Sequence, residues 1–213
     1  MGYAVKEIFR TLQGEGAQAG TPMVFVRFAG CNLWTGRAPD RERDAERTGT
    51  ACPRYCDTDF VGGERLDADE ILARIATAGA GPRWLCLTGG EPALQLDRPL
   101  LEALRGAGYQ TALETNGTVD IAPIRDLLDW VCVSPKRPAR DIVVRDGDEL
   151  KLVWSGQDPR DLAEWEALAF RHYSLQPEDG PRAAEHLAAA IALVRGQGRW
   201  RLSVQTHKLV GLP

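Results

Sequence analysis

Three cysteines lie within one short stretch of the chain, residues 30–60. They are Cys31, Cys52 and Cys56, and the insert between the first two is rich in Arg, Asp and Glu and has almost no apolar side chains. Soft thiolates bind iron or zinc, and a polar insert can stay solvated while its ends are clamped on a metal. This pattern predicts a surface loop that carries a metal centre.

Four interpretations of the cysteine trio differ in what else each requires. A disulfide would leave one thiol unpaired and would suit a secreted chain. A zinc site needs a fourth ligand, which would have to come from His172, His186 or His207 far downstream. Three unrelated thiols are not expected to gather in one loop. An iron-sulfur cube with three protein ligands leaves one iron open for a small molecule. The spacing of the cysteines by itself favours the cluster and the zinc site about equally.

Motifs further along the chain favour the cluster. The run TGGEP at residues 88–92, together with the cysteine loop, resembles the radical S-adenosylmethionine enzymes. Additional motifs, in order over nearly the whole chain, resemble the 7-carboxy-7-deazaguanine synthase family of that superfamily. They are LQGEG (12–16), FVRFAGCNLW (25–34), CDTDF (56–60), ETNG (114–117), SPK (134–136), LQP (175–177) and QTHKLVGLP (205–213).

The cysteine spacing departs from that of most of the superfamily. Most members have three residues between the first and second cysteines and two between the second and third, whereas here the gaps are twenty and three. An enlarged first gap is similar to a known subgroup of the synthase family. The extra residue in the second gap, within Pro53-Arg54-Tyr55, must be absorbed by the loop.

The resemblance implies a [4Fe-4S] cluster on the three cysteines, bound S-adenosylmethionine, and Mg²⁺ on Thr58. Magnesium prefers oxygen ligands and keeps several waters, so one hydroxyl and a substrate carboxylate would suffice, although Thr58 could instead be a capping residue in a plain loop. The absent side chains of Gly89 and Gly90 would let a ligand lie against the backbone. The implied contacts to S-adenosylmethionine are Gly90, Ser134, Pro135, Lys136, Ser174, Leu175, Gln176 and Pro177.

The resemblance also implies a pocket for a carboxylated pterin. Glu114 and Thr88 are candidates for hydrogen bonds to the amino-pyrimidine edge, and Arg27 is a candidate for the carboxylate. The alternatives are an ion-paired surface Arg27, a structural His207 and a simple hairpin turn at residues 13–16. The implied substrate contacts are Leu12, Gln13, Gly14, Arg27, Thr88, Glu114, His207 and the terminal carboxylate of Pro213.

The implied reaction is a radical ring contraction by a carbon-nitrogen lyase. A flavodoxin or ferredoxin would reduce the cluster, and cleavage of S-adenosylmethionine would give a 5'-deoxyadenosyl radical that takes a hydrogen atom from 6-carboxy-5,6,7,8-tetrahydropterin. Loss of ammonia would yield 7-carboxy-7-deazaguanine, a precursor of queuosine. The resemblance also implies a homodimer. Two alternatives remain open: a radical-generating activase of a partner protein, and a zinc-stabilised binding module without catalysis.

The elements that must position these residues alternate along the chain. Strands are expected at residues 3–10, 23–28, 83–87, 109–113, 130–133, 149–154, 170–175 and 200–204, and helices at 67–78, 96–106, 120–128, from 158 onward and at 183–195. This alternation predicts parallel strands joined by right-handed crossovers, hence an α/β fold that forms an incomplete TIM-like barrel with outer helices. Because each polar motif follows a strand, the motifs should converge at one mouth.

Two local patterns add detail to this prediction. Asp67 and Glu70 match a capping box at the start of the first long helix. Cys86 and Cys132 lie inside apolar strands and are expected to be buried, inert thiols.

Length and composition limit the remaining possibilities. The 213 residues suit one domain, residues 1–213 with a cluster-binding insert at about 31–60, and fall short of the roughly 250 residues of a complete eight-stranded barrel. No apolar run reaches the length of a membrane span, and the start MGYAVKEIF lacks the features of a signal peptide, so a cytoplasmic protein is expected. A net charge of -4 without a basic stripe argues against direct nucleic-acid binding.

Overall fold

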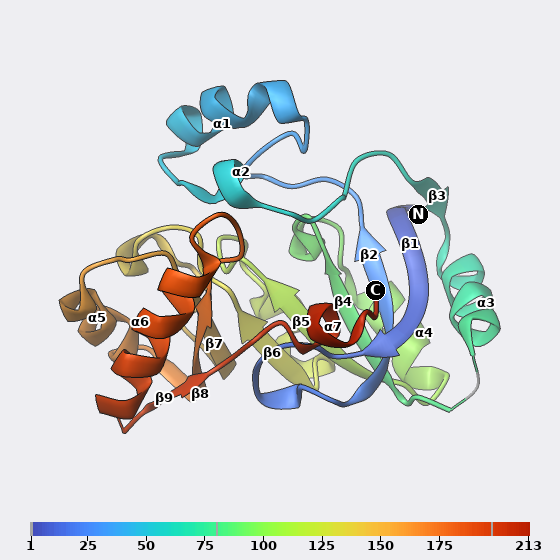
Figure 1. Cartoon of the computed structure of the whole chain (residues 1–213). Helices are drawn as coiled ribbons and strands as arrows, with labels where there is room; N and C mark the ends of the chain where they lie inside the picture. The colour runs from blue at the N-terminus through green and yellow to red at the C-terminus, as the bar shows by residue number, and fades with distance from the viewer. Residues whose placement is uncertain (1, 80, 197) are drawn as a thin grey trace.

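One curved sheet forms the centre of the protein (Figure 1). The computed structural model describes residues 2–79, 81–196 and 198–213. Among these residues the sheet has nine strands in the order β3-β1-β2-β4-β5-β6-β7-β8-β9. From β2 onward in this order the strands are parallel, whereas β1 is antiparallel to both β2 and β3. The strands β1 to β9 span Tyr3–Leu12, Pro22–Phe28, Glu64–Leu66, Trp84–Gly89, Gln110–Thr115, Trp130–Val133, Asp146–Trp154, Ala169–Pro177 and Trp200–Leu202.

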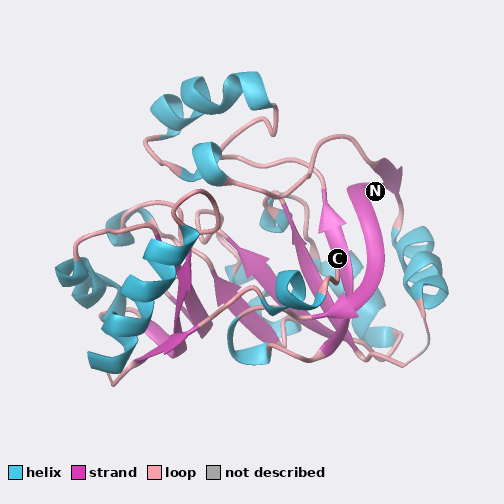
Figure 2. Ribbon diagram, in the orientation of Figure 1, coloured by secondary structure: helices cyan, strands magenta, loops and turns pink. Residues whose placement is uncertain are grey.

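Helices cover the outer face of this sheet, as Figure 2 shows. Helices α3 (Ala68–Ala78) and α4 (Arg98–Gly106) lie over one half, and α5 (Leu162–Glu166) and α6 (Ala183–Gly196) lie over the other. Their buried apolar side chains belong to the same core as those of the strands. Within the described residues, no helix combines the length and the apolar composition needed to cross a membrane.

The remaining helices are short and lie away from this outer layer. Helices α1 (Arg41–Thr48) and α2 (Cys52–Tyr55) belong to the insert and stand above one end of the sheet, and α7 (Thr206–Val210) lies in front of the strands (Figure 1). The 3-10 helices η1 to η6 span Gly16–Gln18, Ala38–Asp40, Pro92–Leu94, Ala122–Leu127, Ala139–Asp141 and Pro159–Asp161.

Most of the expected elements are present, and the differences have local causes. The capping box is confirmed, because the Asp67 carboxylate accepts from the Glu70 N-H at 2.9 Å and the Glu70 carboxylate accepts from the Asp67 N-H at 2.8 Å. The α-helix expected at residues 120–128 is instead the 3-10 helix η4, which contains Pro123, a residue without an N-H. Strand β1 is antiparallel to β2 because the loop between them is too short for a crossover.

Side chains of the parallel strands alternate between an outer and an inner face. In β5, Leu113 is fully buried in the core under the outer helices, so the next residue, Glu114, belongs to the inner face. The same alternation places Cys86, Cys132 and Lys151 on the inner face. Both cysteines are fully buried, as expected, and burial raises their pKa well above the usual range. The inner face is therefore the one that carries buried ionisable groups.

Candidate active site

The three cysteines of the insert line one pocket at the carboxyl ends of the parallel strands. We call it the cysteine pocket. It also includes residues that follow or end successive strands, namely Gly90, Asn116, Ser134, Lys136 and Pro177. The motifs that are separated in the sequence therefore meet at one mouth, as the strand pattern predicts.

The insert is partly helical, and this explains the spacing of its last two cysteines. Cys52 begins helix α2, and the Cys56 N-H donates a hydrogen bond to the Cys52 carbonyl at 2.9 Å. Residues four apart lie on the same side of a helical turn. A single turn thus absorbs the extra residue between these cysteines and leaves both of them facing the pocket.

Aromatic and arginine contacts hold the two ends of the insert together, and one arginine from outside the insert joins it to the segment after β6. The rings of Trp34 and Phe60, from the two ends of the insert, meet edge to face at 5.5 Å, and the Arg41 guanidinium lies 4.5 Å from the Trp34 ring. Arg41 also donates to the Cys56 carbonyl at 3.0 Å. Arg137, which follows the SPK motif, donates to the Thr48 carbonyl at the end of α1 at 2.6 Å. The expectation of a solvated insert holds for most of the charged side chains of α1, since Glu42, Arg43, Glu46 and Arg47 are exposed.

The thiols differ in how readily they ionise. A hydrogen bond from Cys52 lowers the pKa of Cys56 to about 6, despite burial. The same bond, together with burial, raises the pKa of Cys52, and burial raises that of Cys31. The thiolate is the form of cysteine that binds metals. Cys56 is therefore the thiol of the three that gives up its proton most readily, and Cys31 and Cys52 would lose theirs on binding a metal centre.

The arrangement of donors fits a cluster better than a single ion. In the described part of the chain, no group of three or more His, Cys, Asp or Glu side chains is arranged to hold one metal ion. His172 stacks on Trp130, and His186 is buried on α6, with its ring nitrogen 3.4 Å from the Glu178 carbonyl oxygen. The remaining histidine, His207, lines a different pocket. Three thiols spread around one pocket, with no histidine beside them, suit a polynuclear iron-sulfur cluster.

Gly90, the first residue after β4, is required by chain packing. A side chain on Gly90 would overlap the Gly30 carbonyl, and its Cβ would lie 3.0 Å from that of Cys31. The Gly90 N-H donates to the Phe28 carbonyl at 3.2 Å, and the Glu91 N-H donates to the Gly30 carbonyl at 2.9 Å. Gly90 lines the cysteine pocket, but its missing side chain mainly lets the segment that carries Cys31 lie close to the end of β4.

Glu91 joins the motifs that follow β4 and β5. Its carboxylate is fully buried and accepts hydrogen bonds from the Thr115 hydroxyl and the Asn116 N-H, both at 2.7 Å. Burial raises its pKa, while these bonds oppose the rise. The Asn116 side chain in turn donates to Asn32 at 3.0 Å, next to Cys31. This chain of contacts fixes the cysteine segment relative to the strand ends.

A second pocket adjoins the first and contains the chain end. We call it the tail pocket. It is lined by all eight residues implied as substrate contacts: Leu12, Gln13, Gly14, Arg27, Thr88, Glu114, His207 and Pro213. Glu15, Asp57, Thr58, Thr88, Glu114, Lys151 and Gln205 line both pockets. The two pockets are therefore parts of one cleft, and Thr58 lies at their junction.

The C-terminal segment, residues 205–213, forms one wall of this cleft. The Thr206 N-H donates to the Gly14 carbonyl at 2.8 Å, and a side chain on Gly14 would overlap the His207 ring. At the other end, the Thr11 hydroxyl donates to a Pro213 oxygen at 3.0 Å. The segment is thus attached to β1 and to the loop that follows it.

Arg27 is ion-paired and also lines the tail pocket. Its Nε donates to the Glu7 carboxylate at 2.6 Å, and its guanidinium lies 5.6 Å from the Phe9 ring. The two readings of Arg27, surface ion pair and pocket residue, are therefore compatible. A pair through Nε leaves the terminal nitrogens of the fork for a second anion.

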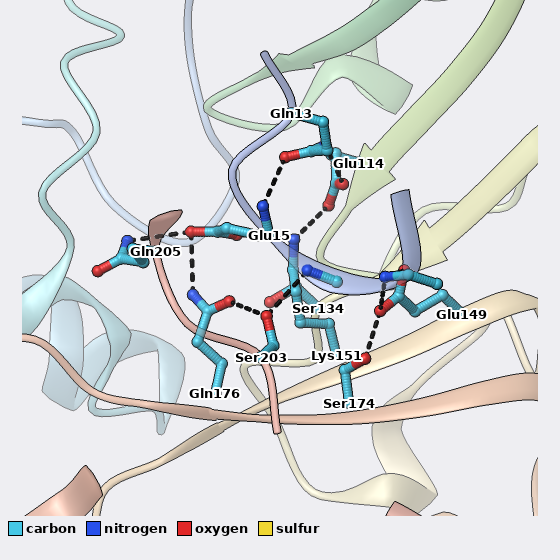
Figure 3. Close-up of polar contacts among 12 residues, drawn as sticks. Gln13, Glu15, Glu114, Ser134, Glu149, Lys151, Ser174, Gln176, Ser203 and Gln205 are labelled. Atoms are coloured by element: carbon cyan, nitrogen blue, oxygen red, sulfur yellow. Dashed lines mark hydrogen bonds and ion pairs between the residues drawn. The ribbon is translucent and has the colours of Figure 1, made fainter. Parts of the chain in front are cut away.

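A buried polar network lies at the junction of the two pockets (Figure 3). The Lys151 ammonium lies 2.8 Å from Glu15 and 3.0 Å from Glu114. Burial raises the pKa of Glu15, but Lys151 and hydrogen bonds from two glutamines outweigh burial and lower it to about 2. Burial dominates for Glu114 and raises its pKa, although Lys151 opposes the rise. The two carboxylates differ because Glu15 has the additional amide donors Gln176 and Gln205, each at 3.0 Å.

Comparison with known proteins agrees with the geometry of the cleft. No protein-family model matches the chain. A curated relative from Burkholderia multivorans, a 7-carboxy-7-deazaguanine synthase, is 49% identical over 222 residues and covers all of both chains. A relative of the same name from Bordetella pertussis is 50% identical over 222 residues, again with full coverage. The chain belongs to the 7-carboxy-7-deazaguanine synthase family.

A solved structure extends this result to the fold. QueE from Escherichia coli is 26% identical, with a TM-score of 0.72, and the likeness covers 97% of this chain and 95% of that one. The expected incomplete TIM-like barrel is thereby confirmed. Two antiparallel partners, β1 and β3, extend its parallel strands.

The contacts to S-adenosylmethionine implied by the synthase family fall into two groups. Gly90, Ser134, Lys136, Gln176 and Pro177 line the cysteine pocket. The other three do not line it: Pro135 faces a neighbouring hollow, Ser174 donates to Glu149, and Leu175 is fully buried.

Sequence reasoning missed some residues of the synthase cleft. Lys151 is a single cation between Leu150 and Leu152 in an apolar strand, and this pattern indicates a buried charge with a function. Glu15 and Gln205 lie within motifs that were recognised, but neither was assigned a contact. Asp57, between Cys56 and Thr58, lines both pockets and was also unassigned.

Proposed function

We propose that the chain converts 6-carboxy-5,6,7,8-tetrahydropterin to 7-carboxy-7-deazaguanine with loss of ammonia, in the route to queuosine. Its family consists of radical S-adenosylmethionine lyases that use a [4Fe-4S] cluster, with Mg²⁺ in the family. The observation that carries the proposal is one continuous cleft, in which three cysteines line one pocket and eight implied substrate contacts line the adjoining one.

In this proposal, the cysteine pocket binds the two cofactors. Cys31, Cys52 and Cys56 would hold the cluster, and Gly90, Ser134, Lys136, Gln176 and Pro177 would bind S-adenosylmethionine beside it. When bound, these cofactors supply the radical that removes a hydrogen atom from the substrate. Pro135, Ser174 and Leu175 would contribute from behind the pocket, with Ser174 acting through its hydrogen bond to Glu149.

The tail pocket would bind and orient the pterin. Glu114 and Thr88 would hydrogen-bond its amino-pyrimidine edge. Arg27, oriented by Glu7, would hold the substrate carboxylate through its free terminal nitrogens. Thr58 would bind Mg²⁺ at the junction, where the ion can also reach that carboxylate. Leu12, Gln13, Gly14, His207 and Pro213 would complete the walls.

We also propose an electron donor, an oligomeric state and a cellular compartment for the enzyme. A flavodoxin or ferredoxin would reduce the cluster, and two copies of the chain would form a homodimer. The chain would act as a single radical S-adenosylmethionine domain, residues 1–213, with its cluster-binding insert at about 31–60. It would work in the cytoplasm, where thiols stay reduced, and would not bind nucleic acid directly.

Replacing the three cluster ligands tests this proposal. Wild-type protein reconstituted anaerobically with iron and sulfide should be brown and should form 7-carboxy-7-deazaguanine. The variant Cys31→Ala/Cys52→Ala/Cys56→Ala should be colourless and inactive, because no thiolate is left to bind iron. Cys86→Ala, which changes a cysteine outside the cleft, should keep both colour and activity.

Other outcomes would contradict the proposal. Iron loading and S-adenosylmethionine cleavage that survive in the triple variant would remove the cysteines from the site. A colourless wild-type protein that binds zinc would indicate a binding module. Cofactor cleavage without conversion of the pterin, but with a radical formed on an added protein, would indicate an activase.

A further inference from the structure

Lys151 is a buried cation that the proposed reaction has not yet used. It lies in β7, is 4% exposed, and is flanked by the core residues Leu150 and Leu152. Its ammonium contacts Glu15 from the loop after β1 and Glu114 from β5 (Figure 3). One side chain thus joins three separate parts of the fold at the centre of the cleft.

A gain in folding stability does not explain why the Lys151 ammonium is buried. Taking an ammonium and carboxylates out of water carries a large desolvation cost, and apolar residues of similar volume often stabilise a protein as well or better. Leu150 and Leu152 show that apolar side chains fill neighbouring positions of the same strand. A role in placing the two carboxylates accounts for a lysine here.

The further partners of each carboxylate connect Lys151 to both parts of the cleft. Glu15 accepts from Gln176, which lines the cysteine pocket, and from Gln205 of the C-terminal segment. Glu114 accepts from Gln13, which lines the tail pocket, at 3.3 Å. Lys151 therefore lies where the cofactor and the substrate would meet.

The negative and positive charges of this network do not balance. The carboxylates of Glu15 and Glu114 share the single ammonium of Lys151, which leaves an excess negative charge. The nearby Glu149 is satisfied separately, because its carboxylate accepts from the Ala17 N-H at 3.0 Å and from the Ser174 hydroxyl. A ligand edge rich in N-H donors would complete the site, since an ionised carboxylate has more acceptor positions than its present partners fill.

We propose that Lys151 is a positioning residue for substrate binding, which holds Glu114 and Glu15 in place and ionised so that Glu114 can accept the N-H groups of the pterin's amino-pyrimidine edge. This inference rests on the proposed function. Without the ammonium, two partly buried carboxylates would face each other, and one would take up a proton or move away. Glu114 would then no longer be a fixed, charged acceptor.

The variant Lys151→Met tests the role of the charge, because Met has a similar length and no ammonium. We expect the KM for 6-carboxy-5,6,7,8-tetrahydropterin to rise about tenfold to a hundredfold, the range for losing hydrogen bonds to a charged group. Iron content should stay at the wild-type level, because the Lys151 ammonium pairs with Glu15 and Glu114 and not with the three cysteines. A variant that is only less stable would keep the wild-type KM, and that result would overturn the proposal.

A matched pair of double variants keeps the test decisive if Lys151→Met does not fold. Glu15→Gln/Lys151→Met and Glu114→Gln/Lys151→Met each remove the ammonium and one carboxylate, so both restore the original net charge. We expect the first, which retains the Glu114 carboxylate, to bind the pterin at least about tenfold more tightly than the second. Equal affinities would contradict the proposal.

Wild-type turnover separates this inference from the proposed function. If wild-type enzyme does not convert the pterin, the proposed function fails. If wild-type enzyme converts it and Lys151→Met does so with the same KM, only the role given to Lys151 fails.

Discussion

In the proposed function, Thr58 is the residue that connects Mg²⁺ to substrate binding. It follows Cys56 by two positions and lines both pockets of the cleft. A threonine hydroxyl is a weak ligand by itself, and Mg²⁺ usually completes its coordination with water and with oxygens of the substrate. In this proposal, the Thr58 hydroxyl would orient the ion together with the substrate carboxylate.

Thr58→Ala should reduce the stimulation of turnover by Mg²⁺, because the ion loses its protein ligand, while iron content stays unchanged. The measurement is the initial rate across a Mg²⁺ titration of the reconstituted enzyme. Thr77→Ala is a matched control, since Thr77 lies on the exposed side of α3 and donates only to its own helix, to the Ala73 carbonyl. An unchanged Mg²⁺ dependence in Thr58→Ala would remove this residue from the metal site.

Lys208 holds the C-terminal segment in place beside the cleft through two ion pairs. The Lys208 ammonium lies 2.7 Å from Asp57, beside Cys56, and 2.6 Å from Asp179, which follows β8. The next residues, Leu209 and Val210, are 77% and 61% exposed, so they contribute little to holding the segment. Its position depends mainly on polar contacts.

Lys208→Met should loosen this element without affecting the cluster. We expect the KM for the pterin to rise about fivefold, because partly exposed ion pairs contribute up to about 1 kcal/mol, while iron content is retained. Arg74→Met removes an exposed ion pair to Glu64 on the outer surface and is the control, with an unchanged KM. A wild-type KM in Lys208→Met would show that the other contacts of the segment suffice.

At the scale of the molecule, one core extends from the first strand to the last. Buried residues from Tyr3 in β1 to Trp200 in β9 belong to a single cluster, and the strands between them form one sheet. From β9 the C-terminal segment runs in front of the strands to the region of β1 (Figure 1). The cleft is therefore enclosed by parts of the chain that all depend on the same sheet.

This continuity predicts a single unfolding transition for the chain without its cluster. The triple cysteine variant is suited to the measurement, because bound cofactors can violate two-state behaviour. Urea unfolding followed by far-ultraviolet circular dichroism and by tryptophan fluorescence should give the same midpoint, since both probes report on one core. Two separated transitions would contradict the proposal of a single domain.

Much of the fold and the identity of the motifs could be predicted from the sequence. Alternating strands and helices give the parallel sheet, and the capping box at Asp67 fixes the start of α3 to within a residue, because these features depend on local chemistry. The cysteine trio and TGGEP indicate the class of chemistry for a similar reason: thiolates bind iron wherever the fold places them. The antiparallel β1 and the 3-10 helix η4 were not predicted.

Only the tertiary structure decided which side chains share the cleft. Cys52 and Cys56 face the same pocket because a helical turn forms between them, a conformation that the spacing alone does not specify. Lys151 meets Glu15 and Glu114 because the sheet brings β5, β7 and the loop after β1 together, across more than a hundred residues of sequence. The sequence by itself determined the motifs and elements, which follow from short-range patterns. Their meeting in one buried network depends on strand order and sheet curvature, which are set by packing of the whole chain.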